Sequence, residues 1–286
     1  MMTSSDRLAA YLERLKLDAA PSPDVAGLTQ VQKAHRHAIA FENLDIPLGR
    51  TIRIDADSVF DKLVTQRRGG YCYEQNRLFA DMLALIGLPS RPLLGRVQLG
   101  LVPGDVPSRT HTLLLLEIDG EPWIADAGFG GSFAPPLPLR DGASAFTDDG
   151  AMHRVRKIGE AGSLGGEWVL ERGGTSAAMD NRASPDDEWK PQFVFDLSPV
   201  APIDLELCNH WTSTRPETRF VTAHVVSIVT PGGFAALTET ALKLYDAQAG
   251  TSEQILASPA AYHAALRDIF GLSISLADVE ALPLFA

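Results

Sequence analysis

Apolar residues recur at helical spacing through the first third of the chain. Four helices are predicted there, over residues 4–20, 28–38, 58–66 and 72–86. The first has the side chains of residues 4–6 as candidate caps and stops near Pro21. The fourth starts near Cys72 and stops at Gly87, with Pro89 two residues further on. This part of the chain is therefore expected to form a helical bundle.

The pattern changes at about Pro89 to short apolar runs broken by Gly, Pro and Asp. Strands are predicted over residues 91–99, 110–118, 122–127 and 168–171. Between them lie loops rich in Pro, Gly, Ala and Asp, such as residues 135–149. Several short strands joined in this way favour a β-barrel or a β-sandwich.

A third pattern follows Gln192. A connecting helix is predicted over residues 203–211, strands over 220–230 and 233–238, and a last helix over 259–270. The expected fold is thus α+β with three domains. They are a helical domain at 1–88, a β-barrel at 89–192, and a connecting helix with a smaller α/β unit at 193–286.

Composition and charge narrow the classes of function. The 286 residues are 45% hydrophobic, which is enough for a sizeable core, and the net charge is −11. Such a surface repels phosphate backbones, so nucleic acid is not an expected partner. It also offers no general attraction to an anionic cofactor, so a site for one must be made locally.

Location and assembly are constrained by the cysteines and the apolar runs. The two cysteines, Cys72 and Cys208, form no disulfide framework, which favours a reducing cytoplasmic setting. The first residues lack the apolar core of a signal peptide. The run Leu113–Leu116 is far too short to cross a bilayer, so no membrane partner is expected. The sequence leaves the oligomeric state open, with a homo-oligomer among the options.

A candidate nucleophile stands at the start of the fourth helix. Gly69 and Gly70 lead into this helix and Cys72 lies in its first turn, where free N–H groups and the helix dipole stabilise a thiolate. With a protonated histidine nearby as well, the thiol is expected to be largely ionised at neutral pH. The same position suits a small buried apolar residue equally well.

A candidate base and its carboxylate lie on one predicted hairpin. A turn at Asp119-Gly120 places Leu113 opposite Asp126, so that His111 and Asp126 become diagonal neighbours on one face. Asp126 could then hold one nitrogen of the imidazole while the other faces Cys72. We expect all three side chains to be exposed at the ends of their elements. A register shift of one residue would separate them, and each also has a purely structural reading.

Several motifs together resemble the arylamine N-acetyltransferase family. The run Arg67–Asn76, which includes RGGYCYEQN, matches the family's cysteine signature, and Phe41–Leu44 resembles its FENL element. Thr110-His111 and Asp126–Gly130 resemble its histidine strand and its aspartate–glycine loop. Trp211–Thr214 resembles a later family segment. Together these matches run in family order to about Phe220, and one departure is Ala40, where many members have proline.

The resemblance implies a helical domain, a β-barrel domain and an α/β lid, with Cys72, His111 and Asp126 as catalytic triad. It implies ping-pong transfer of acetyl from acetyl-CoA, through a Cys72 thioester, to an aromatic amine or hydrazine, with no metal. The implied cofactor-binding residues are Gly128, Phe129, Gly130, Gly131, Thr212, Ser213 and Thr214. The implied substrate-binding residues are Phe41, Val97 and Phe129. The glycines could instead form a plain turn, the hydroxyls could cap a helix end, and Phe41 and Val97 could be core.

Other signals are weaker, and rival functions remain. Glu42 and Arg68 are expected to form an ion pair that braces the cysteine loop. In His35–His37 the two imidazoles point apart on a helix, which favours a packing or solvated face over a metal site, and Cys208 is expected to pack in the core. The rivals are a transglutaminase-like or cysteine-protease enzyme, an amide synthase that uses a carrier-protein or CoA thioester, and a non-catalytic binding module.

Overall fold

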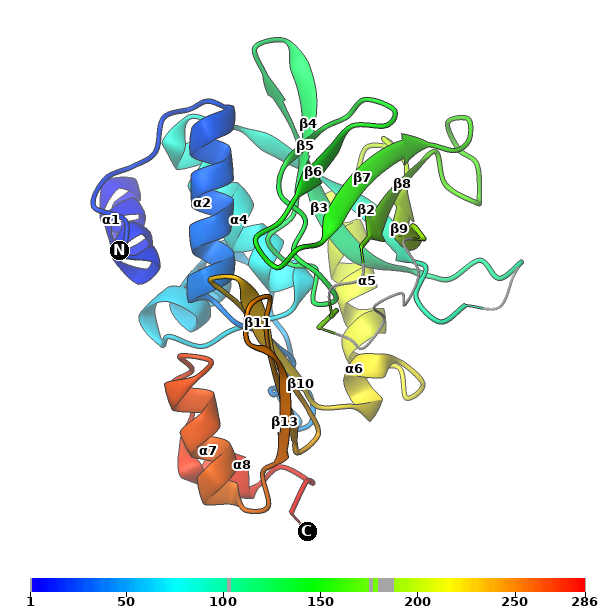
Figure 1. The fold of residues 1–286 in the computed structure, drawn as a ribbon. Coiled ribbons are helices and arrows are strands. Elements are labelled where there is room, and N and C mark those ends of the chain that lie inside the picture. The colour runs from blue at the N-terminus through cyan, green and yellow to red at the C-terminus, as the bar shows by residue number, and fades with distance from the viewer. Residues whose placement is uncertain (1, 102–103, 175–176, 180–187, 286) are drawn as a thin grey trace.

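The computed structural model describes residues 2–101, 104–174, 177–179 and 188–285. The helical part comprises α1 (Ser4–Leu15), α2 (Val25–Ala38), α3 (Ala56–Phe60), the π-helix η1 (Asp61–Thr65) and α4 (Cys72–Ile86). These helices lie side by side (Figure 1) around fully buried Tyr11, Leu28, Leu63 and Phe79. All four predicted helices are present; α4 has the predicted bounds, and the other three differ from the prediction at one or both ends.

The differences at the helix ends have local causes. Helix α1 ends at Leu15 and not near Pro21, because Lys16 adopts the left-handed conformation (φ 59°) that closes the helix. Its cap is Thr3, one residue before the predicted cap residues: the Thr3 hydroxyl accepts from the backbone N–H of Asp6, and the Asp6 carboxylate accepts from the backbone N–H of Thr3. The third helix begins at Ala56, two residues before the predicted start, and continues as the π-helix η1 from Asp61. The periodicity of the sequence does not indicate a π-helix.

The central part is a nearly closed, eight-stranded antiparallel sheet, drawn in green in Figure 1. Its order is β5-β4-β3-β2-β9-β8-β7-β6. The strands are β2 (Ser90–Val97), β3 (Arg109–Ile118), β4 (Glu121–Ala125), β5 (Leu137–Pro138), β6 (Ser144–Phe146), β7 (Met152–Lys157), β8 (Trp168–Gly173) and β9 (Lys190–Phe195). The interior contains buried Leu93, Leu113, Val155, Leu170 and Phe193.

Four of these strands match the predicted ones, and four are additional. Residues 135–149, predicted as a loop, contain the short strands β5 and β6. The predicted boundary at residue 192 falls inside β9, which pairs with both β2 and β8, so the barrel sheet continues to Phe195.

The last part consists of helices around a second antiparallel sheet of order β1-β10-β11-β12-β13 (Figure 1). Its elements are α5 (Pro202–Thr214), α6 (Arg219–Thr222), β10 (Val225–Thr230), β11 (Gly233–Thr238), β12 (Ala241–Asp246), β13 (Gly250–Ile255), α7 (Pro259–Asp268) and α8 (Leu276–Glu280). The strand predicted from Phe220 starts only at Val225, because residues 219–222 form a helical turn. The strands β12 and β13 and helix α8 were not predicted.

One strand of this second sheet comes from the beginning of the chain. The two-residue strand β1 (Phe41–Glu42) pairs with β10, with Phe41 opposite Ser227, and Phe41 also bridges to Gly70. The cysteine loop is therefore tied directly to the C-terminal sheet. None of the helices in the described ranges is long and apolar enough to cross a membrane.

Candidate active site

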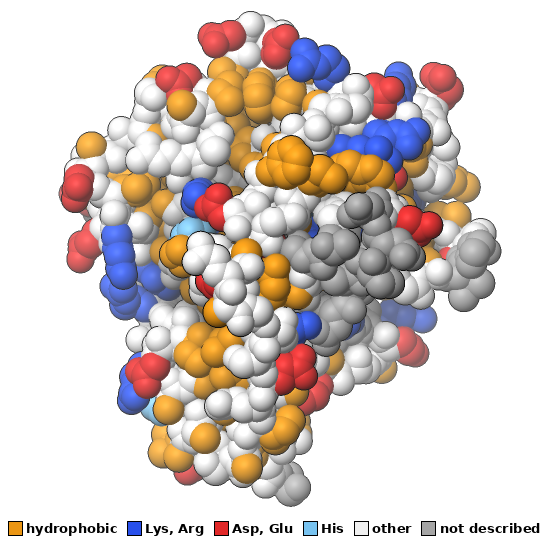
Figure 2. Space-filling model, in the orientation of Figure 1, with side chains coloured by type: hydrophobic (Ala, Val, Ile, Leu, Met, Phe, Trp, Pro, Cys, Tyr) orange, Lys and Arg blue, Asp and Glu red, His pale blue; other side chains and the backbone are white. Residues whose placement is uncertain are grey.

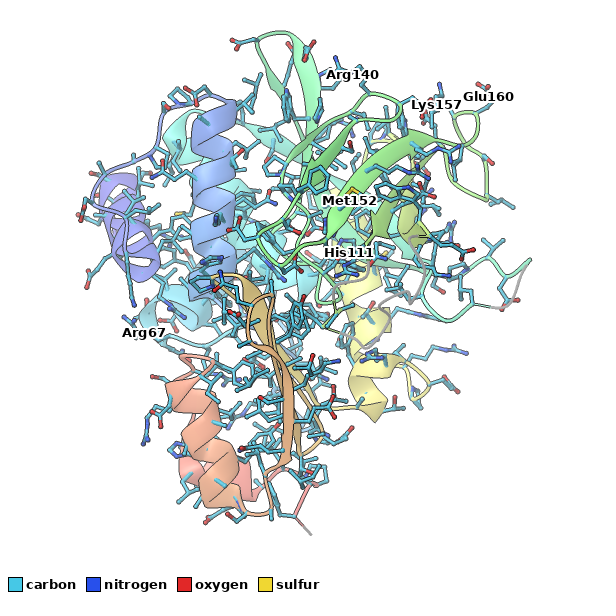
Figure 3. All side chains as sticks on the ribbon, in the orientation of Figure 1. Arg67, His111, Arg140, Met152, Lys157 and Glu160 are labelled. Atoms are coloured by element: carbon cyan, nitrogen blue, oxygen red, sulfur yellow. The ribbon has the colours of Figure 1, made fainter. Side chains whose placement is uncertain are left out.

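Cys72 is the first residue of α4, and the loop before it is tightly packed. A Cβ on Gly69 would lie 2.3 Å from the carbonyl oxygen of Ala40, so only glycine fits there. The side-chain amide of Gln75 donates to the carbonyls of Ala40 (2.8 Å) and Gly70 (3.1 Å). The Arg67 carbonyl accepts a hydrogen bond from the backbone of Ser273 (3.1 Å), and Figure 3 shows Arg67 close to the C-terminal helices. The position of Cys72 is thus fixed from several segments.

The predicted ion pair between Glu42 and Arg68 is confirmed, with Oε1 and Nη2 2.8 Å apart and both side chains buried. It belongs to a larger network that the sequence did not indicate. Arg68 also contacts Asp45 (3.1 Å), and Lys62 contacts both Asp45 and Glu74 at 2.7 Å. Burial raises the pKa of Glu74 to about 7, although Lys62 opposes this. Glu74 in turn accepts the backbone N–H of Tyr71, next to the cysteine.

Removing Arg68 should leave Glu42 buried without its counter-charge. We expect Arg68→Gln to lower the free energy of unfolding by about 3 kcal/mol, the usual cost of breaking a buried pair. The matched control is Arg53→Gln, because Arg53 pairs with Asp55 on the surface, where ion pairs contribute at most about 1 kcal/mol. Urea unfolding of both variants measures the difference, and equal losses would contradict a bracing role for Arg68.

His111 and Asp126 meet at the open end of the β3–β4 hairpin. The register is the predicted one, with Leu114 opposite Ala125, and the ladder ends there. Nε2 of His111 lies 2.6 Å from Oδ2 of Asp126. Figure 3 shows His111 near the middle of the molecule. Since Nε2 is engaged, Nδ1 is the nitrogen left to face a nucleophile.

Asp126 is held by hydrogen bonds from three directions. Its Oδ1 accepts from the side-chain amide of Asn76 (2.9 Å) and from the backbone of Gly128 (2.8 Å), and its own N–H donates to Gln32 (3.1 Å). Burial acts to raise the pKa of Asp126, but the charge of His111 and these hydrogen bonds outweigh it, so the pKa is lowered. The carboxylate is therefore ionised at neutral pH, and Asn76 and Gln32 are partners of Asp126 that the sequence does not indicate.

The expectation that Cys72, His111 and Asp126 are exposed is wrong. Their exposed fractions are 3%, 2% and 8%. Burial raises the pKa of the Cys72 thiol, and the negative charge of Asp126 raises it further, against smaller effects of backbone hydrogen bonds. The expected largely ionised thiol is therefore not what the environment of Cys72 favours. Its sulfur lies 3.6 Å from the carbonyl oxygen of Thr110.

A buried arginine on α2 shapes the loop that follows Asp126. Arg36 donates to the carbonyls of Ala127 and Phe129, each at 3.0 Å. Burial lowers its pKa to about 10, so it remains charged at neutral pH. From the sequence, residues 35–37 are expected on a solvated or packing face. A short basic run such as residues 35–37 does not indicate that its middle residue, Arg36, contacts the loop after Asp126.

The neighbouring His35 is a packing residue, as one reading of the sequence expected. Its Nδ1 lies 2.8 Å from the hydroxyl of Tyr11 and its Nε2 2.6 Å from Oε1 of Gln75. Burial lowers its pKa to about 3, so the ring is neutral. Among the described residues no group of three or more His, Cys, Asp or Glu side chains is placed to hold a metal ion.

Cys72 and His111 line one mostly apolar cavity of about 250 Å³. Its wall includes all the predicted substrate residues, Phe41, Val97 and Phe129. It also includes Gly128, Gly130 and Gly131 from the predicted cofactor loop. Further wall residues that the sequence did not indicate are Leu99, Met179, Arg219, Phe220 and Val225.

Three predicted cofactor residues lie apart from this cavity wall. The hydroxyls of Thr212, Ser213 and Thr214 donate to carbonyls four residues earlier in α5, at 2.7, 2.8 and 2.6 Å. This is the helix-end use of hydroxyl groups that is the alternative interpretation of the sequence. Cys208 on the same helix is a free, half-buried thiol.

Known proteins are similar to this chain in sequence and in fold. The profile of the N-acetyltransferase family matches residues 24–279. The arylamine N-acetyltransferase of Escherichia coli (strain K12) is 32% identical over 92% of this chain and 88% of its own length. The solved arylamine N-acetyltransferase of Salmonella typhimurium superposes with a TM-score of 0.86 at 31% identity, covering 99% of this chain and 98% of that one.

A further solved relative is described with a ligand. The Mycobacterium marinum arylamine N-acetyltransferase in complex with CoA has a TM-score of 0.82 at 32% identity, over 96% of this chain and 97% of that one. Family profile, relatives and structures agree over nearly the whole length, so this chain belongs to the arylamine N-acetyltransferase family.

Proposed function

We propose that the chain is an arylamine N-acetyltransferase, which moves acetyl from acetyl-CoA through a Cys72 thioester to an aromatic amine or hydrazine. One observation carries the proposal. Cys72 lies with the Asp126-supported His111 on the wall of one largely apolar cavity, beside Phe41 and Phe129. The CoA complex of the Mycobacterium marinum relative supports the choice of donor.

In the proposed first half-reaction, Nδ1 of His111 takes the proton of the Cys72 thiol as the sulfur attacks the thioester carbonyl. Coenzyme A leaves as a thiolate and takes this proton from the imidazolium. Burial disfavours a lone thiolate, so ionisation is coupled to proton transfer within the pair, which ionised Asp126 supports. A thiolate of high pKa is in return the stronger nucleophile.

In the second half-reaction the amine attacks the acetyl-cysteine. His111 accepts the proton that the amine loses and returns it to the departing sulfur of Cys72. Arylamines suit this step because they are neutral at pH 7 and keep a free lone pair. Phe41, Val97 and Phe129 are the proposed acceptor contacts, and Gly128–Gly131 the proposed donor contacts. Thr212–Thr214 are not among the proposed contacts, because their hydroxyls are engaged within α5.

We propose that three domains cooperate in this reaction. Residues 1–88 carry the nucleophile, and the barrel domain, extended here from 89–192 to residue 195, carries His111 and Asp126. The remaining residues close the cavity as a lid, since Val225, Val226 and Ser227 of β10 contribute to its wall. A reducing cytoplasm is the proposed setting, because both cysteines are free thiols.

The amide-synthase alternative uses the same chemistry with a larger substrate. Pockets for drug-sized ligands usually measure about 300–1,000 Å³. The cavity of about 250 Å³ beside Cys72 is smaller, which favours a compact aromatic acceptor over the precursor of a macrocycle. A transglutaminase-like activity would need a peptide amide as donor, and the family membership favours the acetyl thioester.

Intact mass spectrometry tests the proposed function. Acetyl-CoA without amine is expected to add one acetyl group to the protein, and an arylamine is expected to remove it again. Cys72→Ala should stay unlabelled, whereas Cys208→Ala should label like the wild type. Stoichiometric labelling of Cys72→Ala, or a wild-type label that no amine discharges, would contradict the proposal.

A further inference from the structure

The wall of the catalytic cavity has an unusual charge balance. The chain has 36 acidic and 25 basic residues, yet no aspartate or glutamate belongs to the cavity wall in the described part of the chain. Acidic side chains are instead scattered over the surface, as the face in Figure 2 shows. The wall includes one arginine, Arg219. A molecule that repels anions overall thus presents a local cation at its catalytic cavity.

Arg219 is placed at the cavity by the turn between α5 and β10. It is the first residue of α6, and its neighbour Phe220 packs its ring 5.8 Å from that of Phe41 and 5.5 Å from that of Tyr71. These ring contacts fix the backbone of α6 beside the wall. The side chain of Arg219 is exposed, so a solute in the cavity mouth can reach it.

Arg219 differs from the other arginine of this turn. Arg215 pairs with Glu217 at 3.0 Å and lies over the ring of Trp211 at 4.2 Å. For Arg219 no carboxylate of the described residues lies within ion-pair distance of its guanidinium. It is therefore available to a ligand, while Arg215 is engaged and does not line the cavity.

We propose that Arg219 binds an anionic oxygen group of a reactant in the catalytic cavity and so sets substrate preference. A guanidinium forms paired hydrogen bonds equally well with phosphate and with carboxylate. Two sources supply such groups, the phosphates of a coenzyme A thioester and a carboxylate on the aromatic acceptor. The inference rests on the proposed function, and the two half-reactions separate the two sources.

The experiment compares wild type, Arg219→Gln, Arg219→Lys and the matched control Arg215→Gln. In the donor arm, the rate of enzyme acetylation is measured with acetyl-CoA and with S-acetyl-N-acetylcysteamine, a thioester without phosphate. In the acceptor arm, discharge of the acetyl-enzyme is measured with 4-aminobenzoate and with its neutral analogue 4-aminobenzamide. Each arm yields a ratio of the second-order rate constants for charged and uncharged reactants.

We expect Arg219→Gln to lower this ratio about fivefold in one arm, because that is the size of effect that an exposed ion pair has. The loss should become smaller at high salt, because salt screens the interaction. A fall in the donor arm identifies phosphate as the ligand, and a fall in the acceptor arm identifies carboxylate. Arg219→Lys should retain most of the ratio, and Arg215→Gln all of it.

Unchanged ratios in both arms, or equal falls in Arg215→Gln, would overturn the role of Arg219. If instead the wild-type protein transfers no acetyl group at all, the proposed function itself fails, and this inference falls with it. The two failures are distinct, because the neutral thioester and the neutral amine report the basic reaction without any anionic group.

Discussion

Asp126→Asn is expected to slow acetylation of Cys72 by about three to four orders of magnitude, the scale seen when a triad carboxylate becomes an amide. The change keeps the volume but removes the charge that supports protonated His111. It also replaces an acceptor 2.6 Å from Nε2 with an amide that can hold the wrong tautomer. Since the environment already raises the pKa of the Cys72 thiol, little thiolate would form without this support. Rapid mixing with acetyl-CoA, followed by detection of released coenzyme A, measures the loss.

The same substitution should change the dependence of stability on pH. The folded state lowers the pKa of Asp126 below its ordinary value of 3.8, so the ionised carboxylate stabilises the fold above that pH. This contribution is lost as the pH falls through the folded-state pKa. Thermal unfolding over a range of pH must therefore accompany the kinetic measurements. The matched control is Asp81→Asn, because Asp81 is a half-exposed aspartate that pairs with Arg77. A folded Asp126→Asn enzyme that acetylates Cys72 at the wild-type rate would refute the triad.

Gly128→Ala is expected to lower activity about a hundredfold although it replaces no ionisable side chain. The new Cβ would lie 2.8 Å from Cα of Cys72 and 2.7 Å from Nδ2 of Asn76, distances that real Cβ atoms do not show. The loop must move, and Nδ2 of Asn76 and the N–H of Gly128 itself are both donors that hold Asp126. A displacement of about 1 Å in a catalytic group costs about this factor.

Overpacking at Gly128 should also reduce the free energy of unfolding, by about 1–3 kcal/mol. The matched control is Gly165→Ala, where the nearest atom to the new Cβ lies 3.9 Å away, in Ser163. Steady-state turnover and urea unfolding of both variants measure the two effects. Full activity in Gly128→Ala would show that the close approach of this loop to Cys72 has no catalytic consequence.

The hairpin that carries His111 and Asp126 was predictable from the sequence because its turn has a strong local signal. Asp119 (φ 53°) and Gly120 (φ 78°) both adopt the left-handed conformation that a tight two-residue turn requires, and such a turn fixes the register of both strands. That register by itself places His111 and Asp126 on one face of the hairpin. The cysteine at the helix start and its two glycines were predicted for similar local reasons.

Burial of the site could not be predicted in this way. Asp126 and the loop after it are contacted by side chains that lie 50 or more residues away in the sequence, namely Gln32, Arg36 and Asn76. No local sequence pattern encodes such contacts. Short strands were missed because two or three residues, as in β5 and β6, show no periodicity. The exposed strand β13 was missed because it lacks the apolar alternation of a half-buried strand.

The anchoring of the cysteine loop has a consequence during biosynthesis. Phe41 pairs with Ser227, and the Arg67 carbonyl accepts a hydrogen bond from Ser273, so two supports of this loop come from the last quarter of the chain. A nascent polypeptide still on the ribosome lacks both until nearly its whole length has emerged. The loop that holds Cys72, the proposed nucleophile, would therefore be assembled at the end of translation, and prematurely terminated chains would be inactive.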